Sequence, residues 1–153
     1  MSTRLEIARA SLAALPMNKR LMGLDLGATT IGIATADYTR QIATPRLTIA
    51  RTKFQADAKA LLEFAEKEEI GLIVLGLPLN MDGTEGPRVQ STKAFARNLE
   101  KLTALPIIYW DERLSTAAVT RTMLEADMSR AKRAENVDKL AAAYILQGLL
   151  DAG

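Results

Sequence analysis

Two short apolar segments separated by only four residues constrain the fold of this chain most strongly. Residues 21–26 and 31–36 are rich in aliphatic side chains, and the residues 27–30 between them begin with a glycine. A connection this short allows only antiparallel pairing, so it predicts a β-hairpin. A third extended segment, residues 42–49, follows after another short turn, and Pro45 within it favours an edge position or an irregular start. The sheet is therefore predicted to begin with a three-strand antiparallel meander.

The next part of the chain alternates between helical and extended patterns. Apolar residues recur at helical spacing in residues 54–69 and again in residues 88–103. Between them, residues 72–77 form a continuous apolar run, which is typical of a strand covered on both faces. Residues 107–110 form a further strand. Strands that are joined through a helix lie parallel in one sheet, so we expect these two to be parallel to each other.

Two more helices are predicted near the C-terminus, at residues 115–126 and 136–150, with Asn136 as the N-cap of the second. The fold class is therefore α/β, a mixed sheet of a three-strand antiparallel meander plus two parallel strands, flanked by helices. Residues 1–19 are predicted to be an N-terminal extension, partly helical, and residues 20–153 to be one domain.

The chain has no segment that indicates a membrane or an export signal. Its longest apolar runs are far too short to span a bilayer, and its basic N-terminal stretch lacks the long uncharged core of a secretory signal. We therefore expect a cytoplasmic protein with no membrane association.

The chain contains neither cysteine nor histidine, and this excludes much enzyme chemistry. The absence of cysteine excludes thiolate nucleophiles, disulfides and Cys-ligated zinc. The absence of histidine excludes imidazole general bases, His-assisted serine hydrolysis and His-bound transition metals. Any catalysis must therefore use carboxylates, lysine or arginine, hydroxyls and a hard metal that prefers oxygen ligands.

Acidic residues occupy three positions where they are not expected by chance. Asp25 lies inside an apolar strand, where a buried carboxylate is costly unless something compensates its charge. Asp111 and Glu112 follow the last strand, at the end of the sheet that usually carries function in α/β proteins. Asp138 lies in the first turn of the predicted final helix, on the face that packs on the sheet. Together these carboxylates are suited to one or two Mg²⁺ or Mn²⁺ ions, which activate water and stabilise displacement at phosphorus.

Each of these positions also has a purely structural interpretation. Asp25 could cap the backbone amides of the turn at residues 27–30. Asp138 could interact with the helix macrodipole, because an acidic residue is favourable at a helix N-terminus.

Positive charge is weak overall but locally concentrated. The net charge is only +2. Arg130, Lys132 and Arg133 lie together in a basic segment that we place in a loop between the last two helices. Such a cluster can contact phosphates, or it can simply be a solvated loop.

Four sequence blocks occur in a fixed order: GLDLG with IGIA at residues 23–34, GLPL at residues 76–79, WDERLST at residues 110–116, and DKLAAAYILQ at residues 138–147. In this order and spacing they resemble the YqgF (RuvX) family, which is associated with Holliday-junction resolution and with pre-16S ribosomal RNA processing. The resemblance covers nearly everything from Arg20 to Asp151, while residues 1–19 lie outside it.

The resemblance implies a ribonuclease H-like fold and a metal-dependent endonuclease site using Mg²⁺ or Mn²⁺. The family's carboxylates fall on Asp25, on the pair Asp111 and Glu112, and on Asp138. Asp25, Glu112 and Asp138 are therefore the implied catalytic metal ligands. We expect Glu112 rather than Asp111 to reach the metal, because strand alternation points the two side chains to opposite faces.

Two further residues are candidates for binding substrate. Arg113 is expected to pair with a carboxylate or to meet a phosphate. Asn80 lies in the loop at residues 79–87, which either recognises substrate beside the site or is an ordinary surface connection.

The chain departs from the family pattern at one position. Thr30 stands where many members have an arginine directly before the Ile-Gly of the second strand. If that arginine holds the substrate backbone, its role here is absent or has moved, either to Arg40 or to the basic segment at residues 130–133.

The expected function is a metal-dependent endonuclease that hydrolyses phosphodiester bonds in 5′-end maturation of pre-16S ribosomal RNA. The alternatives are a Holliday-junction resolvase acting on branched DNA, or a non-catalytic RNA-binding factor in ribosome assembly or transcription. A nucleotide-binding fragment of the actin and sugar-kinase type is also open, because its phosphate-binding strands share the Asp-x-Gly hairpin. Paired cuts at a junction favour a homodimer, whereas a ribosomal RNA nuclease can act as a monomer.

Overall fold

The computed structural model describes residues 3–114 and 130–152, and at Leu114 and residues 130–137 it describes the backbone alone. The elements, in order, are α1 (Arg4–Ala14), β1 (Arg20–Leu26), β2 (Thr30–Ala36), β3 (Ala43–Ala50), α2 (Phe54–Lys67), β4 (Ile70–Leu77), α3 (Pro87–Glu100), β5 (Ile107–Asp111), the 3-10 helix η1 (Glu112–Leu114) and α5 (Arg130–Ala152). The predicted helix at residues 115–126 lies outside the described residues.

The five strands form one mixed sheet in the order β3-β2-β1-β4-β5. β2 pairs antiparallel with both β1 and β3, whereas β4 runs parallel to β1 and to β5. The predicted meander and the predicted parallel pair are thus confirmed. β3 is an edge strand, and its Pro45 lies opposite Ala34, next to a register shift between Ile33 and Ala34. The edge position predicted from the proline is correct, because an edge strand tolerates the missing N–H donor.

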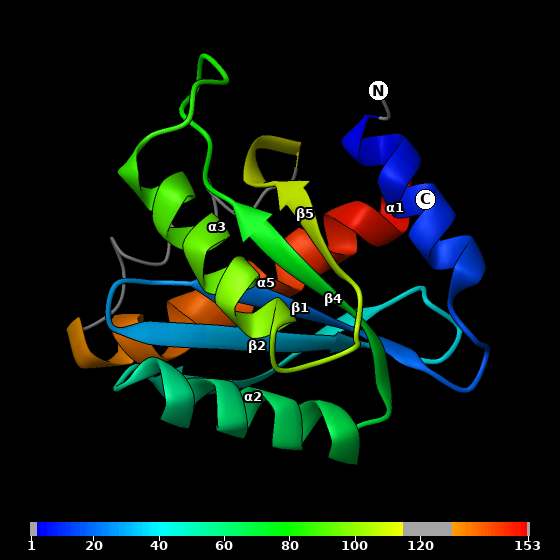
Figure 1. The fold of residues 1–153 in the computed structure, drawn as a ribbon. Coiled ribbons are helices and arrows are strands. Elements are labelled where there is room, and N and C mark those ends of the chain that lie inside the picture. The colour runs from blue at the N-terminus through cyan, green and yellow to red at the C-terminus, as the bar shows by residue number, and fades with distance from the viewer. Residues whose placement is uncertain (1–2, 115–129, 153) are drawn as a thin grey trace.

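Helices cover both faces of the sheet (Figure 1), so the fold has three layers. α2 and α3 lie on one face, where buried side chains such as Leu24, Ile33 and Leu75 form a core with Leu61 and Leu99 of the helices. α5 lies on the other face together with α1, and there Leu146 and Leu149 of α5 form a core with strand residues such as Leu72 and Trp110. The three central strands β2, β1 and β4 are therefore buried on both faces, whereas the edge strand β3 is only partly buried.

The C-terminal helix begins earlier than the sequence predicted. α5 starts at Arg130 and continues to Ala152, so the basic segment forms its first turns instead of a loop, and Asn136 lies within the helix instead of capping it. The physical reason is that Ala, Arg, Lys and Glu all favour helix, and no glycine or proline interrupts this segment. Asp138 therefore lies inside α5, and the macrodipole interpretation of this residue is wrong.

The N-terminal stretch is helical, as predicted, and packs on the sheet. Thr3 caps α1 by accepting a hydrogen bond from the backbone N–H of Glu6 at 3.1 Å. Ala8 and Leu15 are buried in the same core as α5. Over residues 3–114 and 130–152, none of the helices combines the length and the apolar character that crossing a membrane requires.

Candidate active site

The face of the sheet beneath α5 is lined by glycines where the carboxylates lie. Strand alternation places Gly23 and Asp25 of β1 on this face, with Gly27 directly after the strand, while the leucines between them face α2 and α3. A Cβ atom added to Gly23 would lie 3.0 Å from the carbonyl oxygen of Ala142 in α5. The helix backbone therefore approaches β1 more closely than a larger residue would allow.

Asp138 of α5 lies over the turn between β1 and β2. Asp25 pairs across the strands with Gly32, and a Cβ atom at Gly32 would lie only 2.0 Å from the carbonyl oxygen of Asp138. A Cβ atom at Gly27 would lie 2.5 Å from Oδ2 of the same aspartate. The hydroxyl of Thr30 donates a hydrogen bond to this Oδ2. The closely packed helix thus brings the carboxylate of Asp138 to the same end of β1 as Asp25.

Glu112 approaches the same face from β5. It follows the last residue of that strand, and its side chain lies near Gly76 of β4, where an added Cβ atom would be 3.0 Å from Oε1. Gly76 comes directly after the residue that pairs with Leu24, so it lies at the level of Asp25 in the sheet. Both Asp25 and Glu112 are buried, with exposed fractions of 1% and 6%.

The structure therefore places Asp25, Glu112 and Asp138 on one face and at one end of the sheet. They come from three elements that are far apart in sequence. Among the residues that the structure describes, no group of three carboxylates is close enough to enclose one metal ion. The three carboxylates thus share one region of the sheet, but in this arrangement they do not form a complete set of ligands around one ion.

Asp111 has different surroundings from its neighbour Glu112. By strand alternation it points to the α3 side, where Arg113 donates to it from Nη2 at 2.7 Å and from the backbone N–H at 2.9 Å. Burial raises the pKa of the Asp111 carboxyl, but the hydrogen bonds and charge of Arg113 outweigh burial and hold this pKa below its usual value. The expectation that the two acidic side chains diverge agrees with this placement.

Arg113 and Asn80 both have partners within the protein. Arg113 also donates from Nη1 to the carbonyl oxygen of Met81 at 3.2 Å, which ties the loop after β4 to the end of β5. Asn80 donates from Nδ2 to Oγ1 of Thr84 at 2.9 Å, and its backbone N–H donates to the carbonyl oxygen of the same threonine. In this structure Arg113 positions the loop, and Asn80 stabilises it from within.

Arg40 does not replace the arginine that the family resemblance implies at the position of Thr30. Arg40 has a positive φ of 61° and donates to the carbonyl oxygens of Leu12, Leu15 and Pro16 at 2.8–3.0 Å, where it closes the C-terminal end of α1. It follows the end of β2 that is remote from Thr30, so the suggestion that Arg40 takes over the role is wrong. The side chains of Arg130, Lys132 and Arg133 lie outside the described residues.

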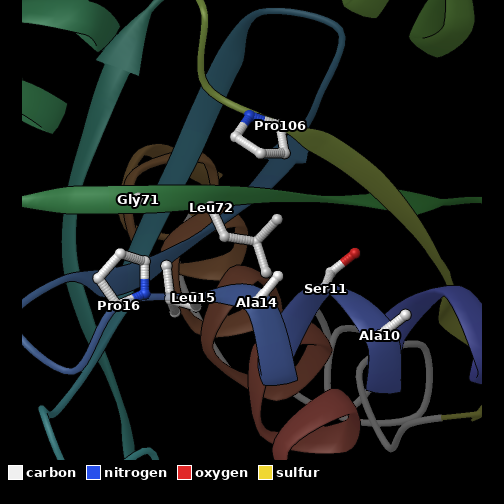
Figure 2. Close-up of a pocket in the computed structure, with 8 residues that line it drawn as sticks. All are labelled: Ala10, Ser11, Ala14, Leu15, Pro16, Gly71, Leu72 and Pro106. Atoms are coloured by element: carbon white, nitrogen blue, oxygen red, sulfur yellow. The ribbon is translucent and has the colours of Figure 1, made fainter.

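A hollow of about 450 Å³ lies between α1 and the starts of β4 and β5 (Figure 2). Its walls are almost entirely apolar and include Ala14, Leu72 and Pro106, with Ser11 at one side. It lies at the opposite end of β4 from Gly76, so it is separate from the carboxylates.

The roles of several residues in shaping the site are not indicated by the sequence alone. Gly32 and Gly76 make the space for Asp138 and Glu112, and Thr30 contacts Asp138 directly. A signal for the close helix was available, because alternation in the block GLDLG puts the glycines and the aspartate on one face and both leucines on the other. No local pattern indicates the contact between Thr30 and Asp138, which joins residues that are 108 positions apart.

Solved structures of resolvases have the same fold. RuvC from Thermus thermophilus in complex with a Holliday junction substrate matches with a TM-score of 0.52 at 13% identity, covering 83% of this chain and 91% of that one. The yeast mitochondrial Holliday junction resolvase Ydc2 matches with a TM-score of 0.50 at 13% identity, covering 99% and 86%. At this identity the similarity concerns the fold alone, and it agrees with the ribonuclease H-like sheet order.

Relatives at much higher identity carry the name "Putative pre-16S rRNA nuclease". The protein from Paramagnetospirillum magneticum is 64% identical over 140 residues, covering 92% of this chain and 90% of the relative. The protein from Methylocella silvestris is 62% identical over 133 residues, covering 87% and 83%. The model of the family described as "RuvX: Holliday junction resolvase" matches residues 19–152. The chain therefore belongs to the RuvX family, a family of nucleases with a ribonuclease H-like fold.

Proposed function

We propose that this chain is a cytoplasmic Mg²⁺- or Mn²⁺-dependent nuclease that hydrolyses phosphodiester bonds in 5′-end maturation of pre-16S ribosomal RNA. The observation that carries the proposal is the position of Asp25, Glu112 and Asp138 at one end of one sheet face, in space made by glycines. The names of the relatives at 56–64% identity support the RNA substrate.

The donors suit a hard divalent cation. Carboxylate oxygens are the ligands that Mg²⁺ and Mn²⁺ prefer, and the chain has no histidine or cysteine that would favour a softer metal. Asp25, Glu112 and Asp138 would hold the ion, and Asp111 is excluded from our proposed set because Arg113 already neutralises it. When bound, the ion would supply an activated water and neutralise charge that develops on the phosphoryl group.

The protein's own residues would prepare this site before the ion arrives. Asp25 is fixed by its strand, and its buried carboxylate would hold the ion together with the buried carboxylate of Glu112. Thr30 orients the carboxylate of Asp138 by its hydrogen bond to Oδ2. Arg130, Lys132 and Arg133 on the first turns of α5 would contact substrate phosphates.

A Holliday-junction resolvase is the second candidate function. It is favoured by the description of the family model. The same carboxylates would serve both functions, so only the substrate distinguishes them.

The test is cleavage of an end-labelled pre-16S RNA fragment and of a four-way DNA junction, each with Mg²⁺ or Mn²⁺. We expect the wild type to cleave the RNA and Asp25→Asn to lose roughly 10³-fold in rate, because several kcal/mol of transition-state stabilisation depend on the ion. The matched control is Asp57→Asn, a buried aspartate on the opposite face that accepts hydrogen bonds from Thr52. It should retain cleavage.

Three other outcomes would change the assignment. Cleavage of the junction alone, lost in Asp25→Asn, would replace the RNA substrate by branched DNA. Binding of RNA without cleavage under any ion would identify a non-catalytic RNA-binding factor. Equal cleavage by wild type and Asp25→Asn would remove the carboxylates from the mechanism.

A further inference from the structure

A second cavity lies at the same end of β1 as the carboxylates, on the other side of the turn. It has a volume of about 270 Å³ and lies between the turn after β1 and the first turns of α3. Two arginines, Arg51 and Arg88, line it together with the hydroxyl-bearing Ser91 and Thr92, and none of its lining residues is acidic. The two cations therefore suit it to an anion, whereas the hollow beneath α1 has no charged residue in its lining.

Arg51 is held against the turn that separates the cavity from the carboxylates. Its Nη1 donates to the carbonyl oxygen of Gly27 at 2.8 Å, and its backbone N–H donates to the carbonyl oxygen of Thr29, also at 2.8 Å. Its guanidinium also lies 5.8 Å from the centre of the Phe95 ring. These contacts fix the cation in place, and the bond to Gly27 uses only one of the five N–H donors of a guanidinium.

Arg88 supplies a second cation from α3. It is exposed, and the first turn of α3 carries no acidic residue. Thr92 donates its hydroxyl to the carbonyl oxygen of Arg88 at 2.9 Å, whereas Ser91 is exposed. Among the side chains that the structure describes, those of residues 3–113 and 138–152, no ion pair involves Arg51 or Arg88. The positive charge in the cavity is thus not balanced by a carboxylate of the described protein.

The turn itself connects the cavity to the site. Gly27 lines the cavity, and a Cβ atom on the same residue would lie 2.5 Å from Oδ2 of Asp138. A nucleic-acid strand whose reacting phosphodiester lies at the carboxylates would therefore pass over this turn, and its next phosphates would meet the two arginines. Guanidinium groups match the geometry of phosphate oxygens and bind them in bidentate fashion.

We propose that the cavity lined by Arg51 and Arg88 binds a backbone phosphate of the nucleic-acid substrate, near the bond that is cleaved. This inference rests on the proposed nuclease function. The inference adds to that function a phosphate site on the α3 side of the turn. This site would contact the nucleic-acid backbone and would not distinguish base sequences.

The experiment measures binding of a fluorescein-labelled single-stranded RNA without divalent ions, so that cleavage does not interfere, over a range of salt concentrations. For single strands, the slope of log K against log salt is about −0.7 per neutralised phosphate. We expect Arg88→Gln to weaken binding several-fold and to reduce the magnitude of this slope by about 0.7. Arg88→Lys should restore most of the slope, because it retains the charge.

The matched control is Arg97→Gln, which removes the same charge from an exposed arginine in the last turn of the same helix, outside the cavity. It should leave the slope of the wild type unchanged. Equal slopes for Arg88→Gln and Arg97→Gln would overturn the proposed phosphate site. The nuclease proposal is tested separately by Asp25→Asn. If Arg88→Gln reduces the salt slope but the wild type shows no metal-dependent cleavage, the phosphate site is retained and the nuclease function is rejected.

Discussion

The two faces of the sheet are packed in different ways, and the difference locates the site. Towards α2 and α3, the central strands present large side chains such as Leu24, Ile33 and Leu75, all fully buried. Towards α5, the same strands present Gly32 and Gly76, so the helix backbone and its side chains occupy the space that side chains of the sheet would otherwise fill. The face with the smallest residues is the one that brings carboxylates together, because close approach of a helix delivers its polar groups to the strands.

Gly32→Ala should have the largest effect on stability. The new methyl group would lie 2.0 Å from the carbonyl oxygen of Asp138 and 2.5 Å from the backbone nitrogen of Lys139. Backbone atoms cannot move aside as a flexible side chain can, so α5 must shift. We expect a loss of about 3 kcal/mol in the free energy of unfolding, at the upper end of the usual range for overpacking. Urea denaturation measures this loss.

The matched control changes the adjacent residue on the opposite face. Ile33→Val removes one methyl group from the core with α2 and α3 and should cost about 1 kcal/mol. It should leave the carboxylates in place and cleavage unchanged, whereas Gly32→Ala should lose cleavage as well. Similar losses of cleavage in both variants would show that stability, and not the position of α5, controls the site.

Asp111 and Glu112 allow the same comparison between neighbouring acidic residues. Asp111→Asn should cost about 1–2 kcal/mol, because it weakens charge-assisted hydrogen bonds to an arginine that is one-third exposed and partly screened by solvent. It should retain cleavage. Glu112→Gln should lose cleavage roughly 10²-fold or more while stability stays near that of the wild type. Chemical denaturation measures the effect of each substitution on stability, and the cleavage assay measures its effect on activity. If Asp111→Asn loses cleavage and Glu112→Gln retains it, Asp111 is the metal ligand.

The stabilising effect of Asp111 should depend on pH. Its pKa is lowered in the folded protein, so its contribution is complete above the usual value of 3.8 and is lost as the pH falls through the lowered folded value. The difference in unfolding free energy between wild type and Asp111→Asn should therefore shrink as the pH falls below about 4. A difference that stays constant from neutral pH to pH 2 would contradict the ion pair with Arg113.

The sheet could be predicted from the sequence because its order depends on local signals. The short turn at residues 27–30 requires an antiparallel hairpin, and helices between apolar runs require parallel strands. The choice of Asp25, Glu112 and Asp138 came partly from these patterns and partly from family resemblance. The structure has all three on one face of the sheet, although among the described residues no three carboxylates lie close enough together to enclose one ion.

What could not be predicted depends on contacts between distant residues. The start of α5 at Arg130 was missed because a basic segment was interpreted as a loop, although its residues favour helix. The charge of Arg40 suggests a phosphate contact, but its partners are carbonyl groups in the last turn of α1 and directly after this helix, more than 20 positions earlier in the chain. The positions of charged residues are known from the sequence, whereas only the tertiary structure shows which partner each of them contacts.

Thr30→Val should have the smallest effect, and it tests how the glycine-lined face holds its carboxylate. The substitution keeps the β-branched shape but removes the hydroxyl that donates to Oδ2 of Asp138. If this bond orients a metal ligand, its loss should weaken Mn²⁺ binding about tenfold, the lower end of the range for residues that support metal ligands. Calorimetric titration of the protein without nucleic acid measures this affinity. Thr29→Val is the control, because Thr29 is an exposed neighbour in the same turn. Equal Mn²⁺ affinities in the two variants would show that Asp138 needs no support from Thr30, and that packing of α5 on Gly32 alone fixes its position.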